Sequence, residues 1–469
     1  MQPFTENIIS QNDAQKTLFS TDSAISSIQG KKVALDFKGG NITSDAGVLM
    51  LSEIEKKIGI IKTLTDCICD SRNPFFIRHT IRELLSQRIF QIACGYEDAN
   101  GCNILRSDPA IKMAVGRLPE NEDEDLGSQP TMSRMENRIT SKELYQIAKG
   151  FVDHFISSYH EPPQVIILDF DDTDDPVHGK QQLALFNTYY GETCYQPMHV
   201  YEGISGKLIT TVLRPGKRPN GKEILSYLKR IVTPIRKQWP ETIIVYRGDS
   251  HYSAPEVFEF ISQQENMYSV AGLTSNAILA KHVKSLIDQV QNKPAGYKRY
   301  HSFLYQAKSW TVARKVVAKV EMTERGLNIR FISTDMSRAK AKHLYEEIYC
   351  ARGNDELYIK DHKTYTKSDR TSCHRFFANQ FRLFLHSAAY VLLHTYRSEL
   401  LRGTRMATAT FDSIRVKLLK VGARVIELKT KIKVHLPTAC PYQDIFAKSL
   451  KMLESLRGQS PPIQLVQKC

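Results

Sequence analysis

Acidic residues at the ends of two predicted strands are the side chains best placed to do chemistry. Asp169 and Asp171 follow the apolar run VIIL, and Asp249 ends the run TIIVYRGD. Residues i and i+2 of a strand point the same way, so Asp169 and Asp171 share a face. Neighbouring parallel strands lie only about 4.8 Å apart, so the two strand ends can bring carboxylates together. Carboxylates held together repel unless a cation joins them, which predicts a site for Mg²⁺ or Mn²⁺.

A third carboxylate for this site is expected from a helix packed on the sheet, and YCARGNDELYIKDHK, residues 349–363, supplies one. At about 100° per residue, its polar and aromatic residues share a strip about 80° wide. These residues are Tyr349, Arg352, Glu356, Lys360 and Lys363. Such a strip does not serve an apolar core, so it predicts Glu356 as a metal ligand among phosphate-binding cations. The helix must continue through Gly353 and Asn354, which are weak helix formers.

Three further segments contain candidates for DNA binding. The loop RPGKRPNGK follows a predicted strand near the site, and we favour DNA contact there over a merely solvated basic surface. Its candidates are Arg214, Lys217, Arg218 and Lys222. Ser133 and Arg134, in TMSRMEN, belong either to a DNA-reading helix or to an ordinary exposed helix start. Trp310 either stacks on a flipped base or, more commonly for such a residue, packs in a local core.

The order of predicted elements indicates a mixed α/β protein with helical and β-rich additions. Residues 1–160 are mainly helical, and apolar strands alternate with helices over 161–275. Residues 276–334 form a β-rich insertion, and helices resume over 335–400. In the last part, 401–469, strict alternation over IELKTKIKVHLP predicts a strand with one basic face, after a helix.

Composition narrows the class of partner and the compartment. The 469 residues contain 64 Lys and Arg against 50 Asp and Glu, a net charge of +14, which favours a polyanion such as nucleic acid. No apolar run approaches the roughly 20 residues of a membrane-spanning helix, so no membrane partner is expected. The nine cysteines form no CxxC pair, which argues against structural zinc and favours a reducing cytoplasm.

The spacing of the helical strip resembles a known signature. Tyr, two residues, Arg, three, Glu, six, Lys is similar to the motif of a large branch of DDE transposases from bacterial insertion sequences, the transposase DDE domain group 1. RGDSHY and LDFDDTDD resemble the segments that contain the second and first Asp of that family. The likeness extends over nearly the whole chain, through SQPTMSRMEN, CYQPMHVYEG, LRPGKRPN, RTSCHRFFANQFRLFLHSAAYVLL and KLLKVGARV.

The resemblance implies an RNase H-like mixed sheet flanked by helices, interrupted by a β-rich insertion, with an α-helical N-terminal DNA-binding region and a small C-terminal extension. It implies that two Asp and one Glu hold two divalent ions, Mg²⁺ or Mn²⁺, which map onto Asp171, Asp249 and Glu356. The first Asp is either Asp171, which matches the Asp-x-Thr pattern, or Asp169, which follows the strand more directly. His251 departs from the smaller residue often found after the second Asp.

The function that these features predict is DNA transposition. The protein would bind the terminal inverted repeats of its own element as double-stranded DNA, cut at the ends and join the 3′ ends to a target. Synapsis of two ends implies a homodimer, acting in the bacterial cytoplasm and bound to the nucleoid. Two alternatives stay open: an RNase H-like nuclease without strand transfer, and a catalytically idle relative that only binds DNA.

Overall fold

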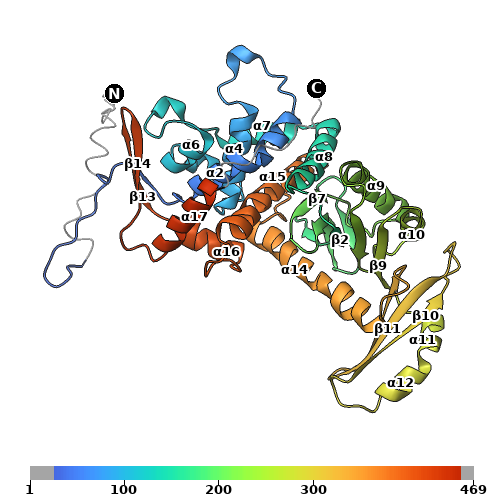
Figure 1. Ribbon diagram of the computed structural model, residues 1–469. Coiled ribbons are helices and arrows are strands. Elements are labelled where there is room, and N and C mark those ends of the chain that lie inside the picture. Colours follow the sequence, from blue (N-terminus) through green and yellow to red (C-terminus); the bar gives the residue numbers. More distant parts are fainter. Residues whose placement is uncertain (1–25, 456–469) are drawn as a thin grey trace, which may run out of the picture.

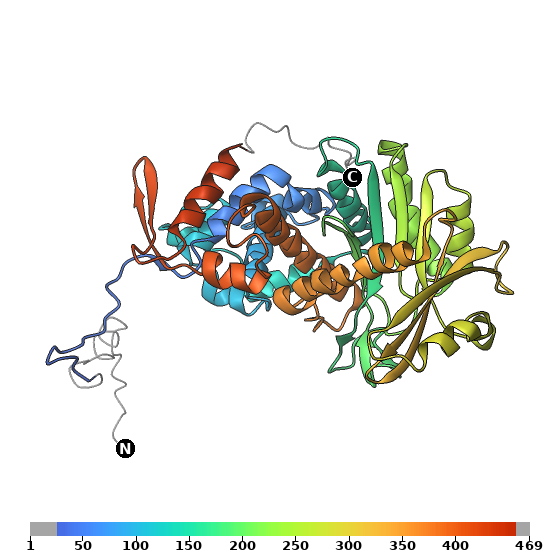
Figure 2. The same ribbon diagram turned by 60° about the horizontal axis from the view of Figure 1, so that its bottom comes forward.

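Figures 1 and 2 show the computed structural model, which describes residues 26–455. A cluster of helices from the first third of the chain lies beside a twisted central sheet, and a long hairpin region extends from the far side of that sheet (Figure 1). Across the described residues, no helix combines the length and apolar character needed to cross a membrane.

The first part of the chain is built from amphipathic helices around a shared core. Thr80 and Thr140 each form a reciprocal capping box with the Glu three residues later, which fixes where α4 and α8 begin. The helices are α2 (Val48–Ile58), α3 (Ile60–Asp66), α4 (Ile81–Ala93), α5 (Gly101–Leu105), α6 (Pro109–Val115), α7 (Gln129–Arg138) and α8 (Ser141–Ser157), with short 3₁₀ turns at η1 (Pro74–Phe76) and η2 (Glu122–Glu124).

One long helix, α15 (Phe376–Thr395), joins these helices to the sheet. It is buried from Ala378 to His394, because it contacts α4, α7 and α8 as well as β7 (Leu208–Val212). An apolar helix buried all round is typical of the centre of a large domain. The core of the helical region therefore extends to Tyr201 and to Leu208 on β7 at one side of the sheet (Figure 2).

The central sheet has eight strands in the order β10-β11-β12-β9-β8-β2-β6-β7. Its middle strands are parallel, namely β2 (Val165–Asp172), β8 (Ile243–Gly248) and β9 (Met267–Leu273), and β6 (Met198–Glu202) runs antiparallel to β2. One face packs Ile166, Leu168 and Phe170 against α9 (Gly221–Gln238) and α10 (Pro255–Ser262). The buried apolar strands predicted at 165–168 and 242–249 are confirmed. A small separate sheet consists of β3 (Asp175–Pro176), β5 (Glu192–Tyr195) and β4 (Leu185–Asn187).

The β-rich segment extends the central sheet. β10 (Lys298–Tyr305), β11 (Arg314–Thr323) and β12 (Gly326–Thr334) form an antiparallel meander, and only the last four residues of β12 pair with β9. The rest of the meander projects beyond the sheet (Figure 1), with α11 (Ala277–His282) and α12 (Lys284–Val290) covering a small core of its own.

The helix predicted around residues 349–363 exists and is continuous but irregular. It begins at α13 (Ala341–His343), passes through the π-helical η3 (Leu344–Tyr349), the 3₁₀ turn η4 (Cys350–Arg352) and α14 (Gly353–Lys360), and ends in the π-helical η5 (Asp361–Tyr365). We call residues 341–365 the signature helix. It runs from the projecting meander to the helical region, across the face of the sheet opposite α9 and α10 (Figure 2).

The single basic strand predicted over residues 426–437 is wrong. The chain turns between Leu428 and Lys431, so that β13 (Ala423–Leu428) and β14 (Lys431–His435) form a hairpin. The turn shifts the phase of the alternation and pairs Ile426 with Lys433, so neither face is uniformly basic. The other elements of this part are η6 (Tyr396–Leu400), α16 (Phe411–Ile414), η7 (Arg415–Leu419) and α17 (Gln443–Ser455), and β13 also pairs with β1 (Ile42–Thr43).

Candidate active site

Two of the predicted carboxylates lie at the same edge of the sheet. β2 and β8 are parallel with Asp169 opposite Arg247, so Asp171 and Asp249 each stand two residues further along adjacent strands. Burial raises the pKa of Asp171 to about 7, the Arg352 guanidinium opposes this shift, and the charge of Asp249 adds to it. The carboxylate of Asp249 also accepts the backbone N–H of His251 at 2.7 Å. Asp171 and Asp249 therefore form an interacting acidic pair.

The middle of the signature helix, at Tyr349 and Arg352, lies beside this acidic pair. The guanidinium of Arg352 lies 3.2 Å from a carboxylate oxygen of Asp171. The hydroxyl of Tyr349 packs against Gly272 on β9, where a Cβ atom would lie 2.7 Å from it and 3.2 Å from the carbonyl carbon of Asp249. A side chain at residue 272 would therefore displace Tyr349, so this close approach requires glycine.

Glu356 lies one helical turn beyond Arg352, on the same side of the signature helix, and its side chain is exposed. Within residues 26–455, no group of three or more His, Cys, Asp and Glu side chains is placed to hold a metal ion. The structure thus brings Asp171, Asp249, Arg352 and Tyr349 together, but it does not gather Glu356 with both aspartates at ligand distance.

Asp169, the alternative first carboxylate, is engaged in a buried ion pair. Both of its oxygens accept hydrogen bonds from the guanidinium of Arg247, and both side chains have no exposed surface. Arg247 also donates to the carbonyl oxygen of Ile348 in the signature helix at 2.5 Å. Gly203 closes the other side, since a Cβ there would lie 2.2 Å from the Asp169 carboxylate. Asp169 therefore fastens the helix to the sheet and is closed to solvent.

Other basic residues of the predicted site differ in accessibility. Lys363 lies 3.0 Å from a carboxylate oxygen of Asp174 and 3.2 Å from the hydroxyl of Thr173, just past the end of β2. Arg218 is exposed and donates to the carbonyl oxygen of Ser250 at 2.6 Å, beside the acidic pair. Lys217, Lys222 and Lys360 are also exposed.

Arg214 is a correction to the predicted DNA-binding set. Only 1% of it is exposed, its guanidinium lies 2.7 Å from a carboxylate oxygen of Glu223, and it also donates to the carbonyl oxygen of Lys217 at 3.1 Å. A guanidinium that holds the loop together from inside cannot contact DNA.

Trp310 and the TMSRMEN segment occupy different environments. Trp310 packs edge-on against Phe258 and Tyr305, with ring centroids 5.7 and 5.6 Å apart, so the simpler packing interpretation describes its contacts. On α7, Ser133 is half-buried and Arg134 is exposed. Arg134 therefore presents its charge to solvent.

Similarity to known proteins identifies the family. Residues 25–458 match the family described as transposase DDE domain group 1. The chain belongs to this family. No curated protein matches. Among solved structures, the piggyBac transposase in a synaptic complex with hairpin DNA is 10% identical, with a TM-score of 0.44 over 90% of this chain and 83% of that chain. A likeness at this level does not by itself define a fold or a function.

Two acids of this DDE transposase-family chain escaped prediction. Asp355, next to Glu356, is buried, and burial followed by the nearby Asp169 raises its pKa well above the usual range. Asp172 accepts from the amide of Gln196 at 3.1 Å and from the hydroxyl of Tyr252 at 3.2 Å. Spacing in the sequence gives no signal for either, because only the tertiary contacts distinguish them from neighbouring acids.

The carboxylate pair suits a hard divalent cation. Oxygen ligands from Asp171 and Asp249 are of the type that Mg²⁺ and Mn²⁺ prefer, and their mutual repulsion is what a bound cation would relieve. Glu356 is exposed on the signature helix, and its side chain is flexible. The two strand carboxylates therefore fit a hard divalent ion, and they are the part of the predicted ligand set that the structure brings together.

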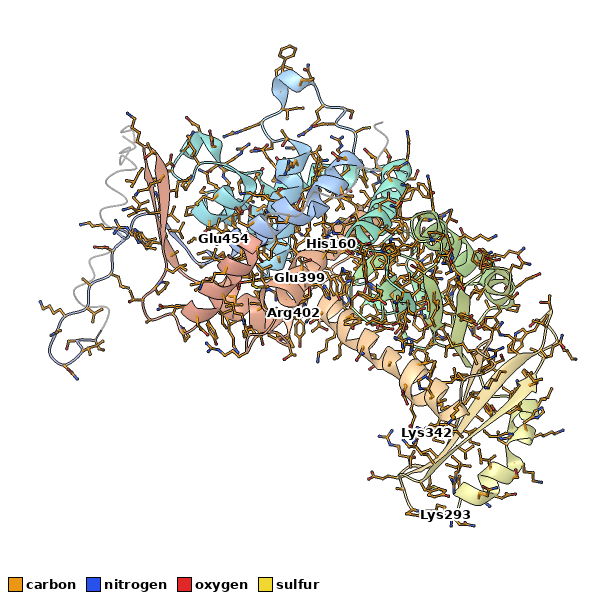
Figure 3. All side chains as sticks on the ribbon, in the orientation of Figure 1. His160, Lys293, Lys342, Glu399, Arg402 and Glu454 are labelled. Atoms are coloured by element: carbon orange, nitrogen blue, oxygen red, sulfur yellow. The ribbon has the colours of Figure 1, made fainter. Side chains whose placement is uncertain are left out.

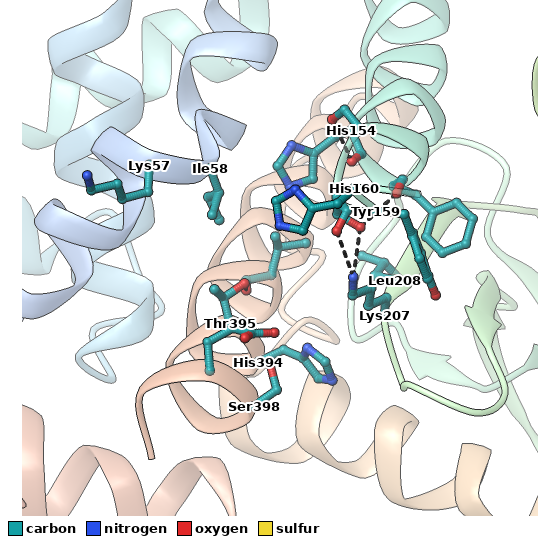
Figure 4. A pocket seen from close by; sticks show the side chains of 15 residues that line it. Lys57, Ile58, His154, Tyr159, His160, Lys207, Leu208, His394, Thr395 and Ser398 are labelled. Atoms are coloured by element: carbon teal, nitrogen blue, oxygen red, sulfur yellow. Dashed lines mark hydrogen bonds between the residues drawn. The ribbon is translucent and has the colours of Figure 1, made fainter. Parts of the chain in front are cut away.

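A separate cavity of about 380 Å³ lies between the helical region and the sheet (Figure 4). Lys207 lines it and donates to the carbonyl and hydroxyl oxygens of Ser158, while His154 and His394 are buried in its wall. His160 and Glu399 mark its position in Figure 3. None of the predicted site residues lines this cavity, so it is not part of the candidate active site.

Proposed function

We propose that this chain is a DNA transposase with an RNase H-like catalytic core. It binds the terminal inverted repeats of an insertion sequence, cleaves at the ends and transfers the 3′ ends to target DNA. The observation that carries the proposal is the acidic pair of Asp171 and Asp249 at adjacent parallel strand ends, with Arg352 paired to Asp171 and Tyr349 packed against Gly272.

We assign Asp171, Asp249 and Glu356 as ligands of divalent metal, Mg²⁺ or Mn²⁺, two ions per site. These residues would hold the ions, whose chemistry would be to activate the attacking oxygen and to stabilise the leaving oxygen during in-line attack on phosphorus. Asp171 is preferred over Asp169, because both oxygens of Asp169 are already bound by Arg247. The assignment requires Glu356 to approach Asp171 and Asp249 when metal and DNA bind.

The basic residues around this acidic pair orient the DNA. Arg352 offsets the charge of Asp171 in the free protein, and its planar fork suits a phosphate when DNA is bound. Tyr349 is held beside it by Gly272 and can donate its hydroxyl to a phosphate or pack against a sugar. The proposed backbone contacts further out are Lys217, Arg218, Lys222, Lys360 and Lys363.

Glu356→Gln tests the catalytic assignment. The DNA that flanks the reading frame provides the candidate terminal repeats, and cleavage of labelled duplexes from it is followed with and without Mg²⁺. We expect Glu356→Gln to reduce cleavage by on the order of a thousandfold while DNA binding is retained, because only a ligand of the reacting centre is lost. Glu347→Gln is the matched control, since Glu347 is an exposed acid of the same helix that pairs with His343 at 2.9 Å.

The same assay separates transposition from simpler activities. Joined products with a second duplex indicate strand transfer, and their dependence on protein concentration indicates whether two copies bring the ends together. Cleavage without joining would point to a nuclease. Full cleavage by Glu356→Gln, or none by the parent protein in Mg²⁺ or Mn²⁺, would refute the proposed catalytic site.

A further inference from the structure

A cavity rich in arginine lies in the helical region and contains none of the proposed catalytic residues. It has a volume of about 660 Å³ and lies between the loop before α4, the start of α4, and α7. Five of its lining residues are arginines and one is acidic, Asp125. The arginines are Arg72, Arg78, Arg106, Arg134 and Arg138. We call it the arginine cavity. So strong an excess of positive charge in a concave surface favours an anionic ligand.

The arginines are held in place by contacts that leave donors free, above all on Arg78 and Arg134. Asp70 fixes two of them: it pairs with Arg72 through both oxygens, at 2.7 and 2.6 Å, and with Arg138 at 3.2 Å. Arg78 makes a single bond, to the carbonyl oxygen of Asp123 at 2.9 Å, and Arg134 makes one to the hydroxyl of Thr131 at 3.2 Å. A guanidinium has five N–H donors, so Arg78 and Arg134 each retain several for a ligand. The others are more engaged, since Arg72 also donates to the carbonyl oxygen of His79 at 2.8 Å, Arg138 to that of Cys69, and Arg106 pairs with Asp125 at 2.9 Å.

A buried histidine in the wall of the cavity lacks a partner. His79 lines the cavity and is only 9% exposed, yet its Nδ1 atom has no hydrogen-bond partner among the described residues. A buried polar atom without a partner costs free energy unless a ligand or water satisfies it. His79 is therefore a second, independent indication that something polar binds here.

Two phenylalanines project beside the cavity. Phe75 is 93% and Phe76 84% exposed, and Phe76 also lines the cavity. They belong to η1, whose start is fixed by the side chain of Asn73, and this turn forms the tip of the blue loop that projects from the helical region in Figure 1. Adjacent exposed aromatic side chains on a projecting turn are unusual in a surface that only meets water, and they mark an interaction site.

We propose that the arginine cavity binds the phosphate backbone of a DNA duplex while Phe75 and Phe76 contact the adjacent sugars and bases. Arginines neutralise phosphates, and apolar side chains inserted at a base step are a recurrent partner of such contacts. Because α7 packs on α15, which also packs on β7, DNA held here is rigidly connected to the sheet that contains the acidic pair. The proposal rests on the proposed function for its choice of DNA as the polyanion.

The test is the salt dependence of duplex binding by the full chain, measured by fluorescence anisotropy in EDTA. Each phosphate contact contributes about 0.9 to the slope of log K against log salt. We expect Arg78→Gln with Arg134→Gln to reduce the slope by about 2 and to weaken binding roughly tenfold per contact at 0.1 M salt. Equal affinity and an unchanged slope would overturn the proposal.

Two further variants make the result specific. Lys62→Gln with Lys149→Gln removes the same charge from exposed pairs with Asp66 and Asp153 in the same region, and we expect a smaller change. An equal loss in that control would show a general charge effect and refute the site. Arg134→Gln alone, which breaks one bond, provides the test if the double variant has a lower melting temperature.

Phe75 and Phe76, which we call the aromatic tip, can be tested independently of the arginines. Phe75→Ala with Phe76→Ala should weaken duplex binding by about tenfold without changing the salt slope, because apolar contacts release no counterions. Unchanged affinity would refute the role of the tip. These measurements need no catalysis, so they separate the two proposals. If Glu356→Gln cleaves normally while the arginine variants bind DNA more weakly with a reduced slope, the catalytic assignment fails but this site stands. If cleavage requires Glu356 but the arginine variants bind DNA normally, the catalytic assignment stands and the arginine cavity is not a DNA-binding site.

Discussion

Asp169 and Asp171 are two residues apart on one face of one strand, and each is paired with an arginine, yet their surroundings differ. The Asp169–Arg247 pair has no exposed surface, and its partners lie within the sheet and the signature helix. In the Asp171–Arg352 pair, the side chains are 16% and 20% exposed, and Asp249 stands alongside. In the first pair, both carboxylate oxygens of Asp169 are bound by Arg247 and closed to a ligand. In the second pair, the carboxylate of Asp171 is partly exposed and stands beside a second acid, so a cation can reach it.

The comparison teaches that pairing alone does not distinguish structural acids from reactive ones. A buried ion pair with every hydrogen bond made fixes two elements against each other, and removing one partner leaves a buried charge. An acidic pair held together at a strand end stores repulsion that a cation relieves. The same strand thus provides an anchor and, two residues later, a candidate ligand.

Asp171→Asn should give the largest effect on activity. We expect strand cleavage to fall by on the order of a thousandfold, because the change removes a ligand oxygen at the reacting centre. The melting temperature should stay the same or rise, since burial already raises the pKa of Asp171 to about 7 and disfavours its charged form. Cleavage assays and thermal unfolding of the same preparation provide the check, and normal cleavage would remove Asp171 from the site.

Asp169→Leu should instead act on stability. The change leaves the Arg247 charge buried without a partner, which costs about 3–5 kcal/mol in the free energy of unfolding. Denaturation by urea measures this loss. Asp169→Leu combined with Arg247→Leu is the control, and it should recover much of the stability, because no buried charge remains. A stable single variant that cannot cleave DNA would mean that the anchor and the ligand have been assigned the wrong way round.

Asp355→Asn should give the smallest effect, a change in thermal stability that differs between low and high pH. Burial and the neighbouring Asp169 raise the pKa of Asp355 in the folded protein above its usual value near 4. The folded state therefore binds a proton that the unfolded state releases, so this contribution is present at low pH and is lost as pH rises through the folded pKa. Thermal unfolding should show Asp355→Asn gaining stability relative to the parent at pH 8 and little at pH 4. Equal differences at both values would contradict the raised pKa.

Part of this structure could be predicted from sequence because it depends on local pattern. The apolar runs before Asp169 and Asp249 predicted buried strands at their actual positions, and the helical strip from Tyr349 to Lys363 predicted a helix through Gly353. The proximity of Asp171 and Asp249 followed from the geometry of adjacent parallel strands. These predictions needed only periodicity and the spacing of strands.

Other features depended on contacts that sequence spacing does not contain. The choice between Asp169 and Asp171 required the position of Arg247, and the burial of Arg214 required its pairing with Glu223. The β13–β14 turn was missed because alternation continues through Lys429 and Thr430, which lack the glycine typical of a tight turn. The role of Glu356 as a ligand stays a prediction, since the described residues do not gather it with both aspartates at ligand distance.

The narrow attachment of the projecting meander has a mechanical consequence. Only four residues of β12 pair with β9 in the sheet, but Tyr300 and Lys298 on β10 both bond Glu346 of the signature helix at 2.6 Å. The outer strands are therefore bonded to the same helix that contains Arg352. A ligand that displaced those strands would therefore act on the helix whose Arg352 faces Asp171.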